Sequence, residues 1–183
     1  EKFIQSVSPQ VVIIPAGRVG GIQANLNAPA DFLLDNLSIA QNIISSSYKH
    51  NVERIIYLGT SCIYPKDCPQ PIKEEYLATQ ELEFTNRSYA IAKITGIEIC
   101  WALNRQYGTK YLAVMPTNLY GINDNYHLEN SHVLPALIRK IHHAKINNID
   151  SVEIWGSGKP MREFLFSDDL ADAIIHICNL QDD

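Results

Sequence analysis

The stretch Ser-Tyr-Ala-Ile-Ala-Lys at residues 88–93 decides how the fold of this chain is interpreted. It lies in a segment with helical periodicity, so Tyr89 and Lys93, four residues apart, rise from one face of one turn. A free phenol has a pKa near ~10, and a neighbouring ammonium favours the phenolate. The pair therefore predicts a tyrosine that acts as general acid or base, although a half-buried tyrosine beside a solvated lysine has the same spacing.

Strand-like segments flank this helix on both sides. Residues 54–58 and 111–115 are mostly apolar, and each runs into a turn with polar side chains, at 59–65 and 116–121. The carboxyl ends of parallel strands meet at one edge of a sheet, where open α/β folds bind ligands. The sequence therefore predicts an open α/β sheet with a ligand crevice beside the Tyr89 helix.

The remaining elements follow in order. Residues 10–15 form a short apolar strand of the kind buried on both faces of a parallel sheet, and a turn of small residues at 16–21 follows it. The apolar stripe of residues 29–50 predicts a crossover helix, in which Asn36 has at most an indirect role. We expect the polar, proline-containing segment 65–86 to cross the crevice as a loop.

Two more helices and one strand are expected near the end of the chain. With Ser88 as its cap, the Tyr89 helix should end before Gly108. A helix should cover 133–141, a strand 152–155, and a second helix, capped by Ser167, should run to residue 180.

Composition narrows the class of protein. The chain has 183 residues, of which 46% are hydrophobic and 19% charged, enough for one ordinary core. The net charge of −5 argues against nucleic acid as the main ligand, and no apolar run approaches the length of a membrane span. The four cysteines have no metal-ligand spacing and favour a reducing, cytoplasmic location.

Five motifs in order carry a resemblance over nearly the whole chain. They are GTSCIYPK at 59–66, YAIAK at 89–93, MPTNLYG at 115–121, NSHV at 130–133 and WGSGKPMREFL at 155–165. Together they closely resemble the extended short-chain dehydrogenase/reductases, and among them the enzymes that convert GDP-4-keto-6-deoxy-D-mannose to GDP-L-fucose. The resemblance implies a partial Rossmann-like, doubly wound parallel sheet at 1–121 and the start of a smaller substrate lobe at 122–183.

The resemblance also implies a reaction, a 3,5-epimerisation followed by a 4-reduction with NADPH. Removal of a proton beside a ketone forms an enolate, which needs a base, a proton donor on the other face and donors to the oxygen. Cys62 and His132 match the family's acid/base pair. Tyr89, with Thr60 or Ser61, would donate to the ketone oxygen. Thr60 stands where many members have serine.

Binding roles are likewise implied by the resemblance. Lys93 would lower the pKa of Tyr89 and hold the cofactor ribose. Other positions match the family's cofactor side, namely Leu58, Gly59, Thr60, Ser61, Pro116, Thr117, Asn118, Leu119 and His132. The GDP-sugar would contact Lys140, Trp155 and Arg162, because an arginine can hold phosphate oxygens in bidentate fashion. Members are typically homodimers through the helices equivalent to that from Pro29 and that bearing Tyr89.

One departure from the family pattern is clear. The Gly-x-x-Gly-x-x-Gly turn that holds the cofactor pyrophosphate is absent, and the turn at 17–21 has a different spacing. We expect either a fragment of a longer enzyme or a natural short paralogue, and the intact catalytic motifs favour the fragment.

Three alternatives stay open at this point. The chain could be another nucleotide-sugar epimerase or dehydratase, although those reactions do not need Cys62 and His132. It could instead be a non-catalytic, truncated sugar-nucleotide-binding module. The third alternative is a cysteine hydrolase, which would leave the Tyr89 and Lys93 pair unexplained.

Overall fold

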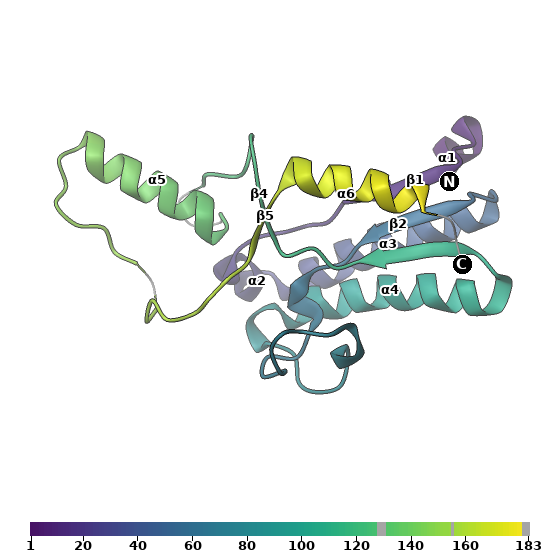
Figure 1. The fold of residues 1–183 in the computed structure, drawn as a ribbon, viewed down its shortest axis with the longest axis horizontal. Coiled ribbons are helices and arrows are strands. Elements are labelled where there is room, and N and C mark those ends of the chain that lie inside the picture. The colour runs from purple at the N-terminus through teal and green to yellow at the C-terminus, as the bar shows by residue number, and fades with distance from the viewer. Residues whose placement is uncertain (128–130, 155, 181–183) are drawn as a thin grey trace.

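A parallel sheet of three strands forms the centre of the molecule in the computed structural model, which describes residues 1–127, 131–154 and 156–180. The strand order is β1 (Val11–Ile14), β2 (Arg54–Leu58) and β3 (Lys110–Val114). Two long helices, α3 (Pro29–Lys49) and α4 (Arg87–Tyr107), connect successive strands and lie side by side on one face of the sheet (Figure 1).

The central strand, β2, is covered on both of its faces. Ile55 and Tyr57 point into the core beneath α3 and α4, whereas Ile56 and Leu58 pack against α6 (Ser167–Asn179). Figure 1 shows α6 on the side of the sheet opposite α3 and α4. Because successive side chains of a strand point to opposite faces, this alternation is that of a doubly wound sheet, and the expected fold class is confirmed.

The expectation for β1 is wrong on one point. Ile14 is 1% exposed, but Val11 and Ile13 are 40% and 45% exposed. Both lie on the α6 side of the sheet, where α6 packs on the neighbouring strand β2. An apolar run is therefore covered on one face only within the described residues.

The long helices begin and end close to where the sequence predicts. Pro29 occupies the first turn of α3, and Gly108 ends α4 in the left-handed conformation with φ of 68°. The cap of α4 is Asn86 rather than Ser88. Pro29 thus predicts the start of α3 and Gly108 the end of α4, whereas the expected N-cap misplaces the start of α4.

A second, smaller sheet links the end of β3 to the later part of the chain. It pairs β4 (Asn118–Tyr120) in parallel with β5 (Phe164–Phe166), and helix α5 (Val133–Ile146) lies to one side (Figure 1). The expected strand at 152–155 is wrong for 152–154, which have no regular structure, and Trp155 lies outside the described residues. The division into domains at residue 121 stays a prediction.

Short elements complete the chain. They are α1 (Lys2–Val7), α2 (Ile22–Asn27) and the 3-10 turns η1 (Ser61–Ile63), η2 (Glu74–Tyr76) and η3 (Phe84–Asn86). The segment 65–86 is anchored on the main core by Cys68, Tyr76 and Leu77. It lies below the amino end of α4 in Figure 1.

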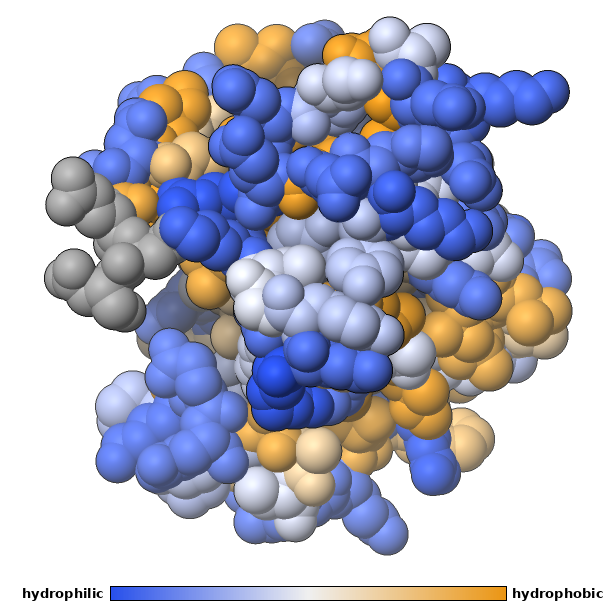
Figure 2. Space-filling view, turned by 90° about the vertical axis from the view of Figure 1, so that its right-hand side faces the viewer, coloured by the Kyte–Doolittle hydropathy of each residue, from blue (hydrophilic) through white to orange (hydrophobic). Residues whose placement is uncertain are grey.

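The surface of the molecule carries exposed apolar side chains among its polar ones. Figure 2 shows the end of the molecule on which α1 lies, where hydrophilic groups are interspersed with apolar patches. Of the helices within 1–127, 131–154 and 156–180, none combines the length and the apolar character that a bilayer span requires.

Candidate active site

Lys93 lies at the centre of the candidate site and is 3% exposed. Its Nζ donates a hydrogen bond of 2.9 Å to the carbonyl oxygen of Leu58, at the carboxyl end of β2. The same Nζ lies 4.9 Å from the ring centroid of Tyr57. Burial lowers the pKa of Lys93 to about 8, because a charged ammonium loses hydration there.

Tyr89 lies one turn before Lys93 on the same helix, beside the hydroxyl-rich turn after β2. A side-chain hydrogen bond joins it to Thr60, and Cys62 is close enough to interact with it electrostatically. Burial, and then Cys62, raise the pKa of Tyr89 to about 12, while Thr60 opposes that change. The phenol is therefore neutral at physiological pH and suited to donating a proton.

This result corrects the expectation for the tyrosine–lysine pair. Lys93 is not among the causes that shift the pKa of Tyr89, which rises rather than falls. The physical reason is that the ammonium is directed to the carbonyl of Leu58 and the ring of Tyr57, while the buried phenol loses hydration.

The turn after β2 sets the positions of Thr60, Ser61 and Cys62. Thr60 is the cap of η1, and its Oγ1 accepts a hydrogen bond of 3.4 Å from the amide of Cys62. All three residues are half-buried. One hydroxyl thus contacts both the phenol of Tyr89 and the backbone that carries the thiol, which brings three of the predicted catalytic residues together.

A contact that sequence reasoning missed joins the turn after β1 to Lys93. A Cβ added to Gly17 would lie 2.9 Å from Oδ1 of Asn36 and 3.5 Å from Nζ of Lys93. Asn36 is buried and binds the backbone of Arg18, the residue after Gly17. Its side chain accepts from the amide of Arg18 at 3.0 Å and donates to the carbonyl of Arg18 at 3.1 Å. The small residue at 17 was the available signal for this close approach.

Phe32 forms the wall between this turn and Tyr89. Its ring meets that of Tyr89 edge to face, with centroids 6.4 Å apart and an interplanar angle of 82°. The guanidinium of Arg18 lies 5.4 Å from the ring centroid of Phe32 and pairs with Asp31 and Asp35 on α3. Phe32 of α3 therefore lies between Tyr89 and Arg18 of the turn after β1.

The same turn reaches the segment of His132. A Cβ on Gly21 would lie 3.1 Å from the carbonyl oxygen of Ser131. Four residues span at most about 14 Å, so the loop from Gly17 to Gly21 ties the Lys93 and His132 segments to one region. His132 itself is exposed and caps α5.

Apart from Lys93 on α4 and His132 at the start of α5, the predicted cofactor residues lie at or just after the carboxyl ends of β2 and β3. The amide of Gly59 donates to the carbonyl of Val114 at 2.8 Å. Pro116 and Thr117 follow half-buried, and Asn118 and Leu119 belong to β4. Leu58, Gly59 and residues 116–119 therefore line one edge, next to the carbonyl that Lys93 contacts.

The predicted substrate residues lie farther along the chain. Lys140 is on α5 and donates to the carbonyl of Glu153 at 3.4 Å. Arg162 is exposed before β5 and donates to the carbonyl of Met161 at 2.7 Å. Trp155 lies outside the described residues, so its predicted role is untested.

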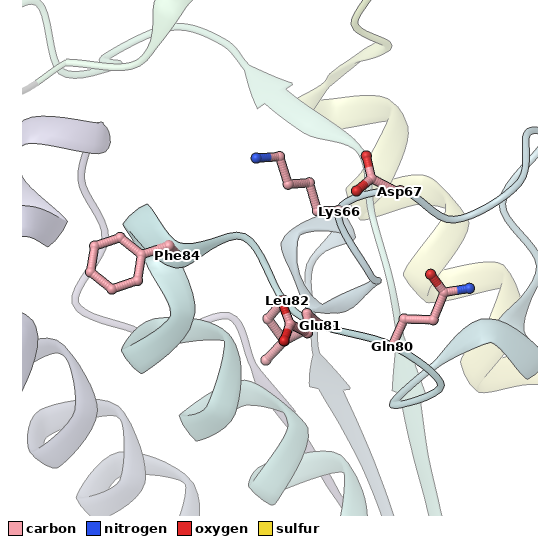
Figure 3. A pocket seen from close by; sticks show the side chains of 6 residues that line it. All are labelled: Lys66, Asp67, Gln80, Glu81, Leu82 and Phe84. Atoms are coloured by element: carbon pink, nitrogen blue, oxygen red, sulfur yellow. The ribbon is translucent and has the colours of Figure 1, made fainter.

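A hollow of about 410 Å³ opens in the segment after the Cys62 turn. Figure 3 shows Lys66 and Asp67 on one side and Gln80, Glu81, Leu82 and Phe84 on the other, with Phe84 turned away from Gln80. Lys66 pairs with Glu83 at 3.5 Å. Across residues 1–127, 131–154 and 156–180, we find no group of three or more His, Cys, Asp or Glu side chains that could hold a metal ion.

Comparison with known proteins gives one family match. The model of the NAD dependent epimerase/dehydratase family matches residues 1–183. GDP-L-fucose synthase 1 of Arabidopsis thaliana is 54% identical over 177 residues, which are 97% of this chain and 55% of that protein. GDP-L-fucose synthase of Escherichia coli strain K12 is 51% identical over 178 residues, covering 97% and 56%.

Solved structures that are similar to this chain include a protein named for the same function as these relatives, a GDP-L-fucose synthetase. A GDP-L-fucose synthetase from Naegleria fowleri bound to NADP has a TM-score of 0.85 and 35% identity, covering 95% of this chain and 57% of that one. The chain spans about half the length of the curated relatives it matches.

Proposed function

The chain belongs to the NAD dependent epimerase/dehydratase family, and on that premise we propose that it forms the catalytic centre of a GDP-L-fucose synthase. Such an enzyme epimerises GDP-4-keto-6-deoxy-D-mannose at C3 and C5 and reduces the ketone at C4. The observation that carries the proposal is the cluster of Tyr89, Thr60 and Cys62 beside the buried Lys93.

The first half of the reaction needs groups that move protons next to a ketone. Cys62 and His132 would remove and return protons at C3 and C5. Tyr89 would donate a hydrogen bond to the ketone oxygen and stabilise the enolate as negative charge develops there. A phenol with a pKa raised to about 12 supports this role, since it keeps its proton at neutral pH.

The second half needs a hydride, which NADPH would supply when bound. The buried Lys93 fits a ribose, because an ammonium has three N–H donors and the carbonyl of Leu58 accepts from one of them. A Cβ on Gly17 would lie 3.5 Å from that ammonium, so a side chain at this position would crowd it. We propose that the cofactor side consists of residues 58–61, Lys93, residues 116–119 and His132. Tyr89 would protonate the C4 oxygen.

The substrate and assembly follow as parts of the same proposal. Lys140, Trp155 and Arg162 would bind the GDP-sugar, with the arginine on the diphosphate. A homodimer would pack through α3 and α4. The four cysteines are all free thiols, which supports the cytoplasm as the location.

Replacement of the tyrosine tests the reduction. In the active protein that carries this chain, Tyr89→Phe should lower the rate of NADPH oxidation by about 10²–10⁴-fold while binding of the GDP-sugar persists. Stopped-flow absorbance and calorimetry measure the two quantities. Undiminished turnover in the variant would remove Tyr89 from the mechanism.

Replacement of the thiol separates this function from a 4-epimerase or a 4,6-dehydratase. Cys62→Ser should lower solvent deuterium incorporation at C3 or C5 by about 10²-fold, because a hydroxyl is a much weaker acid and base at this site. NMR of the sugar measures the exchange. The proposal of 3,5-epimerisation fails if deuterium enters both positions at the normal rate.

A further inference from the structure

Tyr57 is a buried aromatic residue for which the mechanism above has no use. It is the last but one residue of β2 and is 1% exposed. Its neighbours in space include Tyr89 and Cys100, both on α4. Burial raises the pKa of its phenol, so the ring stays neutral over the physiological pH range.

The ring of Tyr57 is held in place by the helix that carries the catalytic pair. Gly96 faces it, and a Cβ at that position would collide with Cζ and the hydroxyl oxygen. α4 can therefore approach β2 closely only because residue 96 lacks a side chain. This approach brings Nζ of Lys93, one turn earlier, to 4.9 Å from the ring centroid of Tyr57.

The other groups that the described residues place near the ammonium are neutral. Leu58 contributes a carbonyl oxygen from β2, Gly17 contributes backbone, and Asn36 of α3 has an amide near Gly17. The carboxylates Asp31 and Asp35 are paired with Arg18 instead. The aromatic face is thus the second group, after the carbonyl of Leu58, that replaces water around the charge.

We propose that Tyr57 is a positioning residue, whose ring face holds the ammonium of Lys93 beside Tyr89 by a cation–π interaction. A separation of 4.9 Å lies within the ~6 Å range of such interactions. The contact is desolvated, which is the setting in which they are strongest. Its use in catalysis rests on the proposed function, whereas the contact itself does not.

A series of ring substitutions tests the contact without turnover. The variants are Tyr57→Phe and the same phenylalanine with one, two or three ring fluorines, which keep its shape but weaken the negative ring face. The pKa of Lys93 is measured from the ¹³Cε shift of labelled lysine, assigned with Lys93→Met. We expect little change for Tyr57→Phe and a stepwise fall that reaches about one unit for the trifluorinated ring.

Lys49 provides the matched control, because its side chain is 59% exposed and its shift should not follow the series. Thermal unfolding of each variant checks that the fold is kept. A pKa of Lys93 that stays constant across a folded series overturns the proposal. Because NADPH and sugar are absent from this experiment, its result is independent of whether the chain belongs to a fucose synthase.

Catalysis gives the second readout, in the active protein that carries this chain. The pH at which the rate of reduction begins to fall should move in the same order as the pKa of Lys93. A purely structural role for Tyr57 would lower the melting temperature and leave that pH unchanged.

Discussion

Lys93 brings a positive charge into a part of the molecule that has almost no contact with water. Its pKa falls from 10.5 to about 8. Between these two pH values the unfolded chain holds a proton that the folded chain has lost, so the free energy of unfolding rises with pH. Below pH 8 both states are charged, and folding bears the full cost of burial, up to about 3 kcal/mol.

Lys93→Met should therefore be more stable than the original chain at pH 7, and its advantage should shrink as the pH rises from 8 to 10. Urea unfolding at a series of pH values measures the difference between the two proteins. Lys49→Met is the control and should show no such trend, since Lys49 is exposed. A difference that is constant from pH 7 to 10 would mean that Lys93 is not desolvated in solution.

The residue scale also shows what the sequence could reveal about the site. Thr60, Cys62 and Tyr89 could be placed together because polar groups after parallel strands meet at one sheet edge. The direction in which the pKa of Tyr89 shifts could not be predicted, because burial is the largest cause of the shift and spacing along a helix does not report burial. The contact of Gly17 with Asn36 and Lys93 depends on tertiary packing and carries no periodic signal.

At the scale of elements, α6 is joined to the sheet through Arg54. This residue begins β2, and its Nη1 donates to the carbonyl of Cys178 at 2.8 Å and to those of Ile177 and Leu180 at 3.3 Å. The last carbonyls of a helix have no partners within it and form the negative end of its dipole. The guanidinium of Arg54 donates hydrogen bonds to these carbonyls, and its positive charge complements the negative end of the helix dipole.

Arg54→Met should lower the free energy of unfolding by about 1–3 kcal/mol, because it removes hydrogen bonds from a charged donor to partly buried carbonyls. The control is Arg105→Met, whose pair with Glu98 at 3.7 Å joins two side chains that are 66% and 53% exposed. That variant should cost about 0.5 kcal/mol or less. Equal losses in the two variants, measured by urea unfolding, would contradict the role given to Arg54.

Elements differ in how well their sequences predict them. α3 and α4 are long, periodic and bounded by Pro29 and Gly108, so local sequence is sufficient. α2 has six residues and packs against η3. β4 and β5 have three residues each and depend on pairing with each other and on the packing of Leu165 against buried side chains of β2 and α6. The strand expected at 152–155 fails for 152–154 because an apolar run needs a partner strand to pair with.

At the scale of the whole molecule, the proposed homodimer would bury the outer surface of α3 and α4. Leu34 on α3 and Ile91 on α4 are 61% and 39% exposed and lie on the helices proposed to form the homodimer. Placing a lysine at both positions should convert a dimer to a monomer, since two charges would be buried without partners. Sedimentation velocity measures the change in mass.

Ile175→Lys is the control for that experiment. Ile175 is 58% exposed and belongs to α6, on the opposite face of the sheet. This variant should keep the dimer. If Ile175→Lys dissociates the protein and the double variant on α3 and α4 does not, the proposed interface is on the wrong face.

The loop between β1 and α2 has a further consequence for anyone who recombines this protein with its relatives. Gly17 fits against the lysine of the catalytic pair, and Gly21 fits against the backbone just before His132. A hybrid that joins the first 121 residues of one parent to the later residues of another would mismatch the second of these fits. Crossover points that inherit the glycine turn and residues 131–132 from the same parent should therefore give more functional hybrids than a crossover at residue 121 does.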